Sequence, residues 1–228
     1  MANTGNIIIV EQDTNPNSAT YNTTRIRTVQ DYIECIPDGM KLYYKTENGS
    51  GSLQCNSDYA LTGTETSSFR SSIVEASVGN CVSAIGYEAF EILSANMPLT
   101  SYKLRKVVLP DTITNISGYA FSCNRNLTDI NLPYGLQVIG DHAFYYCDHL
   151  TEITIPASVA TISSFAFSQC NGLVSITCLP TTPPTLGTSN PFENSSGWIY
   201  VPAESLNAYK TADKWKDIKS RIKAIGSE

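Results

Sequence analysis

A unit of about 23 residues repeats along the middle of the chain, and it restricts the possible fold more than any other feature. Three copies align over residues 115–133, 138–156 and 161–180 and share the pattern I-[GS]-x-x-A-F-x-x-x-x-x-L-x-x-I, followed by a proline. Phe121, Phe144 and Phe167 occupy the same position in the three copies and are evenly spaced. A period of about 20–29 residues with this leucine and isoleucine spacing is a signature of a leucine-rich solenoid.

A fourth copy precedes these three and carries an insertion. Residues 85–90 open it and residues 104–110 close it, with eight residues inserted within 91–103. Residues 72–78 match more weakly and are expected to supply one further strand.

Each repeat shows two periods. Spacings of four, four and three residues from Ile139 to Leu150 predict a short helical turn. Residues 150–156 then alternate between apolar and polar, which predicts a short strand that ends at Pro156. One such unit cannot bury its apolar face, whereas stacked units can. The predicted fold is therefore a leucine-rich repeat solenoid, β-rich with short helical turns.

The string I-G-x-x-A-F-x-x-C-x-x-L-x-x-I-x-[IL]-P resembles the BspA-like leucine-rich repeats, which are common in surface proteins of Bacteroidales-type bacteria of the gut and mouth. The resemblance covers about residues 72–180. Cys123 departs from it, because it follows its phenylalanine by two residues instead of three. Residues 199–210, with Trp215 after them, resemble the C-terminal unit found behind such repeats. The resemblance implies a surface protein that binds a partner.

The two ends of the chain do not follow the repeat. Residues 197–202 predict a strand and residues 203–225 predict an amphipathic helix that closes the last coil. Residues 41–46 and 52–55 flank a Gly-containing turn and predict a hairpin. The expected division is a β-rich N-terminal region (1–70), the repeats (71–180) and a strand-helix cap (181–228).

A short apolar run near the N-terminus is a candidate assembly anchor. It consists of Ile7, Ile8, Ile9 and Val10, in a region too polar to bury them. An unpaired apolar strand is an aggregation liability unless another chain covers it. We therefore expect residues 1–70 to hold an anchoring arm, and the chain to be a homo-oligomer or a component of a larger particle.

Composition and charge exclude several classes of protein. The chain has 228 residues and a net charge of −6, which argues against a nucleic-acid partner. No apolar run is long enough to span a membrane. The N-terminus has neither the basic start nor the apolar stretch of a signal peptide. We therefore expect a cytoplasmic chain that later reaches a virion or a bacterial cell surface, unless a leader has been removed.

The sequence offers no catalytic or metal-binding motif. It has two histidines, His142 and His149, at variable positions of one repeat, where solvated surface residues are expected. The seven cysteines contain no C-x-x-C pair, which predicts neither a disulfide framework nor a zinc site. Cys123, Cys147 and Cys170 recur with the repeat and are expected to be buried free thiols. We predict no enzyme activity, no metal and no cofactor.

The outward residues of the repeat strands form the candidate binding site. Alternation places Ile130 and Leu132 inside, so that their neighbours point outward and align in columns from coil to coil. The predicted face is polar and slightly acidic and consists of Lys106, Val108, Asp129, Asn131, Glu152, Thr154, Ser175 and Thr177.

Two functions fit this pattern. The first is a non-enzymatic binding or adhesion module that presents the face to a protein or a surface glycan. The alternative is a structural virion protein, such as a phage head fibre, tail or decoration protein, anchored by residues 1–70 with the repeats displayed.

Overall fold

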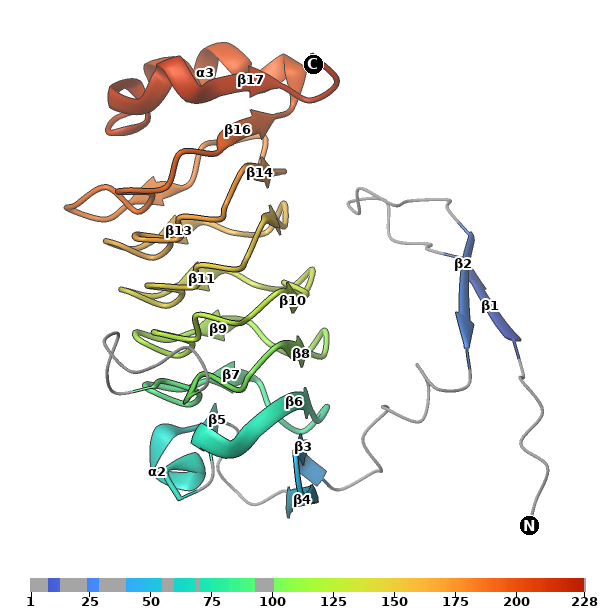
Figure 1. Cartoon of the computed structure of the whole chain (residues 1–228). Helices are drawn as coiled ribbons and strands as arrows, with labels where there is room; N and C mark the ends of the chain where they lie inside the picture. Colours follow the sequence, from blue (N-terminus) through green and yellow to red (C-terminus); the bar gives the residue numbers. More distant parts are fainter. Residues whose placement is uncertain are drawn as a thin grey trace.

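From Met40 onward the chain winds into a stack of coils, each of which lies directly on the coil before it (Figure 1). The computed structural model describes residues 8–12, 24–28, 40–54, 60–68, 70–92 and 101–227. Each repeat contributes one short strand to each of two parallel ladders. The leucine-rich repeat solenoid predicted from the repeat period is confirmed.

The first ladder contains the longer strands. It consists of two sheets, with the strand orders β10-β8-β6-β3-β4 and β12-β14-β16-β17. The strands are β3 (Met40–Thr46), β4 (Gly49–Gln54), β6 (Ile73–Val78), β8 (Lys106–Val108), β10 (Asp129–Ile130), β12 (Glu152–Ile155), β14 (Ser175–Cys178), β16 (Trp198–Val201) and β17 (Ile222–Ala224).

The second ladder is a single parallel sheet of very short strands, in the order β15-β13-β11-β9-β7-β5. Equivalent residues pair across neighbouring coils, as in Ile116 beside Ile139 beside Ile162. The strands are β5 (Ala60–Leu61), β7 (Ala84–Ile85), β9 (Asn115–Ile116), β11 (Val138–Ile139), β13 (Thr161–Ile162) and β15 (Thr185–Leu186).

The predicted helical turn is present in each coil, but it does not extend into a helix. In one coil Ala143 N donates to Gly140 O and Cys147 N donates to Phe144 O, each three residues back. His142 and Tyr146 have φ of 55° and 57°, in the left-handed region, and interrupt any regular helix. Phe144 N instead donates to Ala166 O of the next coil at 2.7 Å, so these turns also join the coils together.

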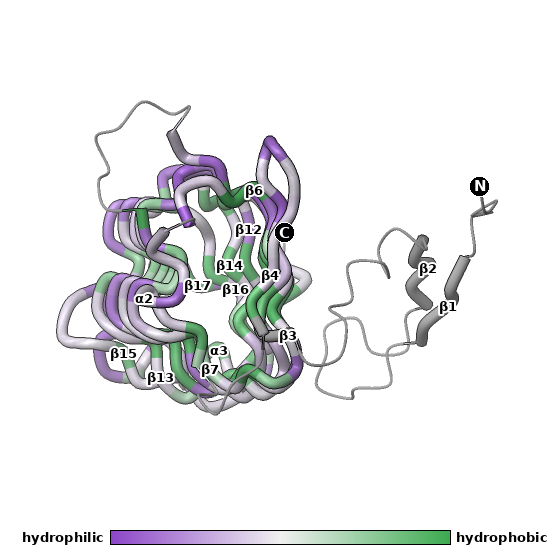
Figure 2. Tube along the Cα trace, turned by 90° about the horizontal axis from the view of Figure 1, so that it is seen from below, coloured by the Kyte–Doolittle hydropathy of each residue, from purple (hydrophilic) through white to green (hydrophobic). Residues whose placement is uncertain are grey.

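A column of phenylalanine rings fills the core. The stacked neighbours lie 5.0–5.9 Å apart between ring centroids, with interplanar angles of 2–11°. All of these rings are buried, and they are Phe90, Phe121, Phe144, Phe167 and Phe192. Viewed along the stack, equivalent residues of successive coils superpose, so hydrophobic residues gather in continuous stripes (Figure 2).

An N-terminal hairpin covers the first coil. β3 and β4 are antiparallel and join through a turn at Glu47 and Asn48, which confirms the predicted hairpin. β3 also pairs antiparallel with β6, so the hairpin extends the first ladder. The helical pieces α2 (Gly63–Thr66) and η1 (Arg70–Ser72) follow.

The first strands of the chain form a separate antiparallel pair, β1 (Ile8–Gln12) with β2 (Thr24–Thr28). Of the predicted anchor residues, Ile8, Ile9 and Val10 lie in β1, and Ile7 lies outside the described residues. The boundaries of the three predicted parts of the chain remain a prediction.

The C-terminal cap differs from the single long helix that residues 203–225 predicted. It is built from η3 (Ala203–Ser205), α3 (Leu206–Thr211) and η4 (Trp215–Arg221). Ala212 is extended and Lys214 has a φ of 62°, so the helix breaks between α3 and η4. The chain then returns as β17, which pairs in parallel with β16 and adds a last strand to the first ladder.

The cysteines divide into two groups. Cys81 is disulfide-bonded, contrary to the expectation from sequence, and its partner lies outside the described residues. Cys123, Cys147 and Cys170 are free and buried, as predicted, and Cys178 is as well. However, Asn124 rather than Cys123 occupies the place of Cys147 and Cys170, because it follows its phenylalanine by three residues.

Candidate binding surface

The outward residues of the first ladder form two columns, which we call the strand face. In the first column Glu75 lies beside Lys106 and Lys106 beside Asp129, while Glu152, Ser175 and Trp198 continue it beyond β10. In the second column Ser77 lies beside Val108. Farther along that column Thr154, Thr177, Tyr200 and Lys223 follow one another.

Seven of the eight predicted face residues lie at outward positions of these strands. Their inward neighbours are in the core, as Ile153 and Ile176 show with exposures of 4% and 0%. Asp129, Asn131, Glu152 and Thr154 are exposed, and the other four predicted residues are partly buried. The period-2 alternation was therefore sufficient to place these side chains.

Asn131 is different, because its side chain bonds to the backbone of the preceding coil. Leu109 N donates to Asn131 Oδ1 at 2.8 Å, and Asn131 Nδ2 donates to Leu109 O at 2.7 Å. These two bonds take the place of strand pairing just beyond β10, which is only two residues long. Asn131 thus connects two coils, and its amide is already occupied.

The strand face extends beyond the predicted residues at both ends. At the N-terminal end Lys45 Nζ lies 3.0 Å from Glu75 Oε2, and a pocket is lined by Tyr43, Lys45, Glu75 and Lys106 among others. The repeat pattern does not predict this part of the face, because β3 belongs to the hairpin and not to a repeat.

At the C-terminal end the face becomes aromatic. Trp198 is 43% exposed, and Lys223 Nζ lies 3.8 Å from the centre of its indole ring. Tyr200 follows Trp198 by two residues in β16. The sequence predicted a strand over residues 197–202, but it did not predict that this strand would join the first ladder.

The acidic residues of the face lie between these two ends. Asp129 and Glu152 are exposed in successive coils, and no Lys or Arg occurs between Asn126 and Tyr209 in the sequence. Asp129 lies beside Lys106, which has the opposite charge, and Glu152 lies beside Ser175. The middle of the face therefore presents carboxylates and threonine hydroxyls, and its end presents an indole ring.

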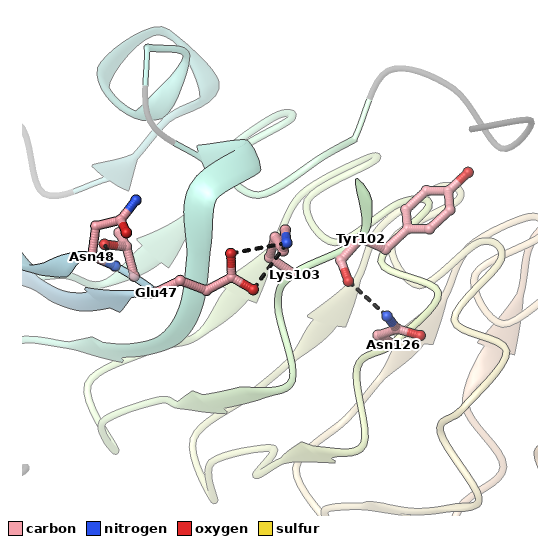
Figure 3. A network of polar contacts seen from close by, with 6 residues as sticks. Glu47, Asn48, Tyr102, Lys103 and Asn126 are labelled. Carbon is pink, nitrogen blue, oxygen red and sulfur yellow. Dashed lines mark hydrogen bonds and ion pairs between the residues drawn. The ribbon is translucent and has the colours of Figure 1, made fainter. Parts of the chain in front are cut away.

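The insertion in the fourth repeat meets both the hairpin and the next coil (Figure 3). Lys103 Nζ lies 2.9 and 3.0 Å from the two carboxylate oxygens of Glu47 in the β3–β4 turn. Asn126 Nδ2 donates to Tyr102 O at 2.7 Å. These contacts position the hairpin beside the coils, although an exposed ion pair adds little stability.

The two histidines have different surroundings. His149 is exposed and its Nδ1 lies 2.6 Å from Arg125 O. His142 is not simply solvated, as had been expected, because its ring lies between Tyr119 and Phe165. Among the residues that the structure describes, no group of three or more His, Cys, Asp or Glu could hold a metal ion. Within the same residues, no helix has the length and apolar character needed to cross a membrane.

The fold and the strand face define a class, that of leucine-rich repeat solenoids with a surface of aligned strand residues. Residues 93–199 match the family described as BspA type Leucine rich repeat region, in 6 copies. Residues 93–199 thus carry leucine-rich repeats of the BspA type, as the sequence motif predicted. No curated protein matches the chain.

Solved bacterial structures resemble this fold. The leucine-rich repeat protein of T. pallidum is 22% identical, with a TM-score of 0.51 and coverage of 74% of this chain and 71% of that one. A leucine-rich cell surface protein from Faecalibacterium prausnitzii is 24% identical, with a TM-score of 0.46 and coverage of 75% and 41%. A leucine-rich repeat protein from Bacteroides ovatus is 18% identical, with a TM-score of 0.41 and coverage of 85% and 53%. This chain therefore spans less than half of the Faecalibacterium protein. At these identities the similarity concerns the fold alone.

Proposed function

We propose that this protein is a non-enzymatic binding module that presents its strand face to a protein or a surface glycan. The observation that carries the proposal is the alignment of outward residues along the two stacked sheets, one row from Lys45 to Asp129 and one from Glu152 to Trp198. Exposed indole rings are frequent anchors in binding sites, and the hydroxyl and carboxylate groups beside this one supply hydrogen bonds.

The disulfide at Cys81 supports a location outside the cytoplasm. Disulfides persist in oxidising environments such as the cell surface and are rare in the cytosol. The four free cysteines of the described residues are buried and therefore compatible with such an environment. We propose that the chain acts at a bacterial cell surface.

Mucin is a suitable probe, because it offers polypeptide and glycans together. We expect the full chain to bind a mucin-coated surface, and Thr154→Arg to weaken binding by about tenfold or more, since a long cation then fills the second column. Thr182→Arg is the matched control, because Thr182 is exposed on the connector before β15, and it should change binding by no more than about twofold.

Periodate treatment of the mucin separates the two kinds of partner. Loss of binding after treatment identifies a glycan, and retained binding identifies a protein. If Thr154→Arg and Thr182→Arg bind as well as the unaltered chain, the strand face is not the binding site. If neither mucin nor an array of bacterial surface glycans retains the chain, the proposal of an adhesion module fails.

The alternative function, a structural virion protein such as a phage head fibre, remains a second proposal. One observation favours it: β1 and β2 pair with each other and belong to neither ladder. A separate N-terminal hairpin fits an arm that attaches the repeats to a larger particle.

A further inference from the structure

A second row of side chains runs up the solenoid at the turns that follow the second ladder. Tyr119, His142 and Phe165 occupy the same repeat position, two residues before the stacked phenylalanines. The Tyr119 and His142 rings are stacked, with centroids 4.7 Å apart and an interplanar angle of 5°. The His142 and Phe165 rings are 4.9 Å apart.

Two further tyrosines join this row. Tyr87 packs edge-on against Tyr119 at 5.7 Å, and Tyr145 packs edge-on against His142 at 5.0 Å. We call this set of five rings the aromatic ridge. It follows β7, β9, β11 and β13, and these strands lie on a different side of the coils from β12, β14 and β16 of the strand face (Figure 2).

At three positions of the ridge the backbone has a conformation that is unfavourable for bulky side chains. Tyr119, His142 and Phe165 have φ of 57°, 55° and 57°. Glycine and asparagine adopt this left-handed conformation easily, whereas it is costly for bulky side chains. The same conformation recurs at other turn positions, such as Cys123, Tyr146 and Gln169, so it belongs to the turn of the repeat and not to the ridge alone.

The ridge rings also lie outside the buried core. Tyr87 is 57% exposed, and the other four rings are partly exposed, unlike the buried phenylalanine column beside them. Contiguous exposed apolar surface of this kind marks interaction sites on soluble proteins.

Carboxylates flank the ridge. Asp141 Oδ2 lies 2.8 Å from His142 Nδ1. Burial raises the pKa of Tyr119 first, and the nearby charges of Asp141 and Glu91 raise it further. The pKa of Tyr87 is raised by burial and then by Glu88 and Glu91. Arg70 offsets part of this charge, because its Nη1 donates to Glu88 O at 2.6 Å and its charge acts to lower the pKa of Glu91. The three carboxylates outnumber it, so the ridge lies in a negative field, which repels a second copy of the same surface and attracts cations.

We propose that the aromatic ridge binds a segment of a partner protein that is rich in Lys and Arg. The carboxylates of Glu88, Glu91 and Asp141 accept hydrogen bonds from its ammonium and guanidinium groups. The aliphatic stems of its side chains lie along the ring edges. A sugar would need open ring faces, but neighbouring rings cover the faces of His142.

The test exploits the left-handed backbone, because glycine removes a ring there without adding strain. We expect a fluorescein-labelled octa-arginine peptide to bind the full chain at low salt. The double variant Tyr119→Gly and Phe165→Gly, which leaves the net charge unchanged, should weaken this binding by about tenfold or more, as hot-spot truncations do. Its midpoint of denaturation should stay the same or rise.

Two double variants, each of which removes two negative charges, compare the ridge with the strand face. Glu88→Gln with Glu91→Gln removes two charges at the ridge and should also weaken binding of the peptide. Asp129→Asn with Glu152→Gln removes two charges from the strand face, and binding should remain within about twofold. If the glycine variant fails to fold, Tyr119→Asn provides the same comparison, because asparagine tolerates positive φ.

Several results would overturn the proposal. If the double glycine variant binds the octa-arginine peptide as well as the unaltered chain does, the binding depends on net charge alone. Ridge-dependent binding of maltoheptaose, a neutral glycan, would identify a sugar site instead. Self-association that the ring variant abolishes, measured by light scattering, would identify the ridge as a contact between copies. Because the strand face is tested by Thr154→Arg, failure here leaves the proposed function standing.

Discussion

A single aromatic residue per coil sets the spacing of the whole core. The stacked column ends on Trp215 of the cap, whose ring centroid lies 6.0 Å from that of Phe192. Each phenylalanine therefore contacts the coil below and the coil above. Loss of one ring should leave a cavity that the rigid coils on either side cannot close.

Phe144→Ala is expected to lower the free energy of unfolding by about 3–5 kcal/mol, as core phenylalanine truncations do. Denaturant melts of the full chain measure this loss. Val174→Ala is the control, since Val174 is 62% exposed, and it should change stability by no more than about 0.5 kcal/mol. A loss below about 1 kcal/mol for Phe144→Ala would contradict the stacked core.

The buried thiols give the chain a pH dependence at alkaline pH. Cys170 Sγ lies 3.0 Å from Phe144 O, and burial raises the pKa of this thiol to about 12 from a usual value of 9.0. Burial raises the pKa of Cys178 to about 12 as well. The folded state thus keeps both thiols neutral at a pH where the unfolded chain ionises them.

The difference in thiol pKa between the folded and the unfolded chain sets how the unfolding free energy changes with pH. The stability that comes from the neutral thiols is fully present below about pH 9 and is lost as the pH rises toward about 12. Cys170→Ala should therefore make the fall in unfolding free energy between these two values shallower than in the unaltered chain. Identical slopes would show that Cys170 already ionises in the folded protein.

At the scale of elements, the join between β8 and β10 depends on one side chain. β10 is the shortest strand of the first ladder, and Asn131 bonds to both backbone groups of Leu109 just beyond it. Leu109 is buried at 3% exposure, whereas Asn131 is exposed, so these bonds are partly shielded from water.

Asn131→Ala is expected to cost about 1–3 kcal/mol of unfolding free energy, because two hydrogen bonds that each contribute about 0.5–1.5 kcal/mol are lost. Thr154→Ala, at the equivalent position of the next coil, should cost less than about 0.5 kcal/mol, because β12 pairs fully with β14. Equal losses in chemical denaturation would mean that the Asn131 bonds do not hold the coils together.

The cap gives a structural role to three of the six basic residues that lie between Lys210 and Lys223. Lys214 Nζ donates to Gly187 O at 2.6 Å, and Arg221 donates to Gly197 O at 2.6 and 2.9 Å. Lys223 covers Trp198. These cations satisfy carbonyl oxygens and a ring at the end of the stack, so their clustering has a structural cause.

At the scale of the molecule, the solenoid is a series of coils closed at both ends. The β3–β4 hairpin covers one end, and α3, η4 and β17 cover the other (Figure 1). Because each coil contacts mainly its neighbours, stability is approximately a sum over coils and interfaces. Segments outside the two caps contribute little to that sum.

Deletion of residues 1–28 should therefore leave the midpoint of thermal unfolding nearly unchanged. If the N-terminal strands anchor the chain in an assembly, the same deletion should convert a multimer or a particle-bound form into a monomer, as measured by light scattering. A monomer before and after the deletion, with no retention by any particle, would contradict the anchoring arm. A large fall in the unfolding midpoint would show that residues 1–28 belong to the folded core.

The sequence by itself determined the period of the coils and the direction of the strand residues. Both are local properties, because a repeat of constant length returns Phe121 to the place of Phe144, and alternation sends Ile153 inward and Glu152 outward. The N-terminal hairpin was also readable, since its turn signal lies within a short stretch of chain.

The tertiary structure determined the contacts between neighbouring coils. It gave Asn131 a connecting role, turned the end of the cap into β17, bonded Cys81 and brought Tyr119 into contact with His142 of the next repeat. Each of these depends on which groups meet when coils stack about 4.8 Å apart. A pattern within one coil carries no information about an unpaired carbonyl or an exposed ring in the next coil, so these features appear only once the coils are stacked.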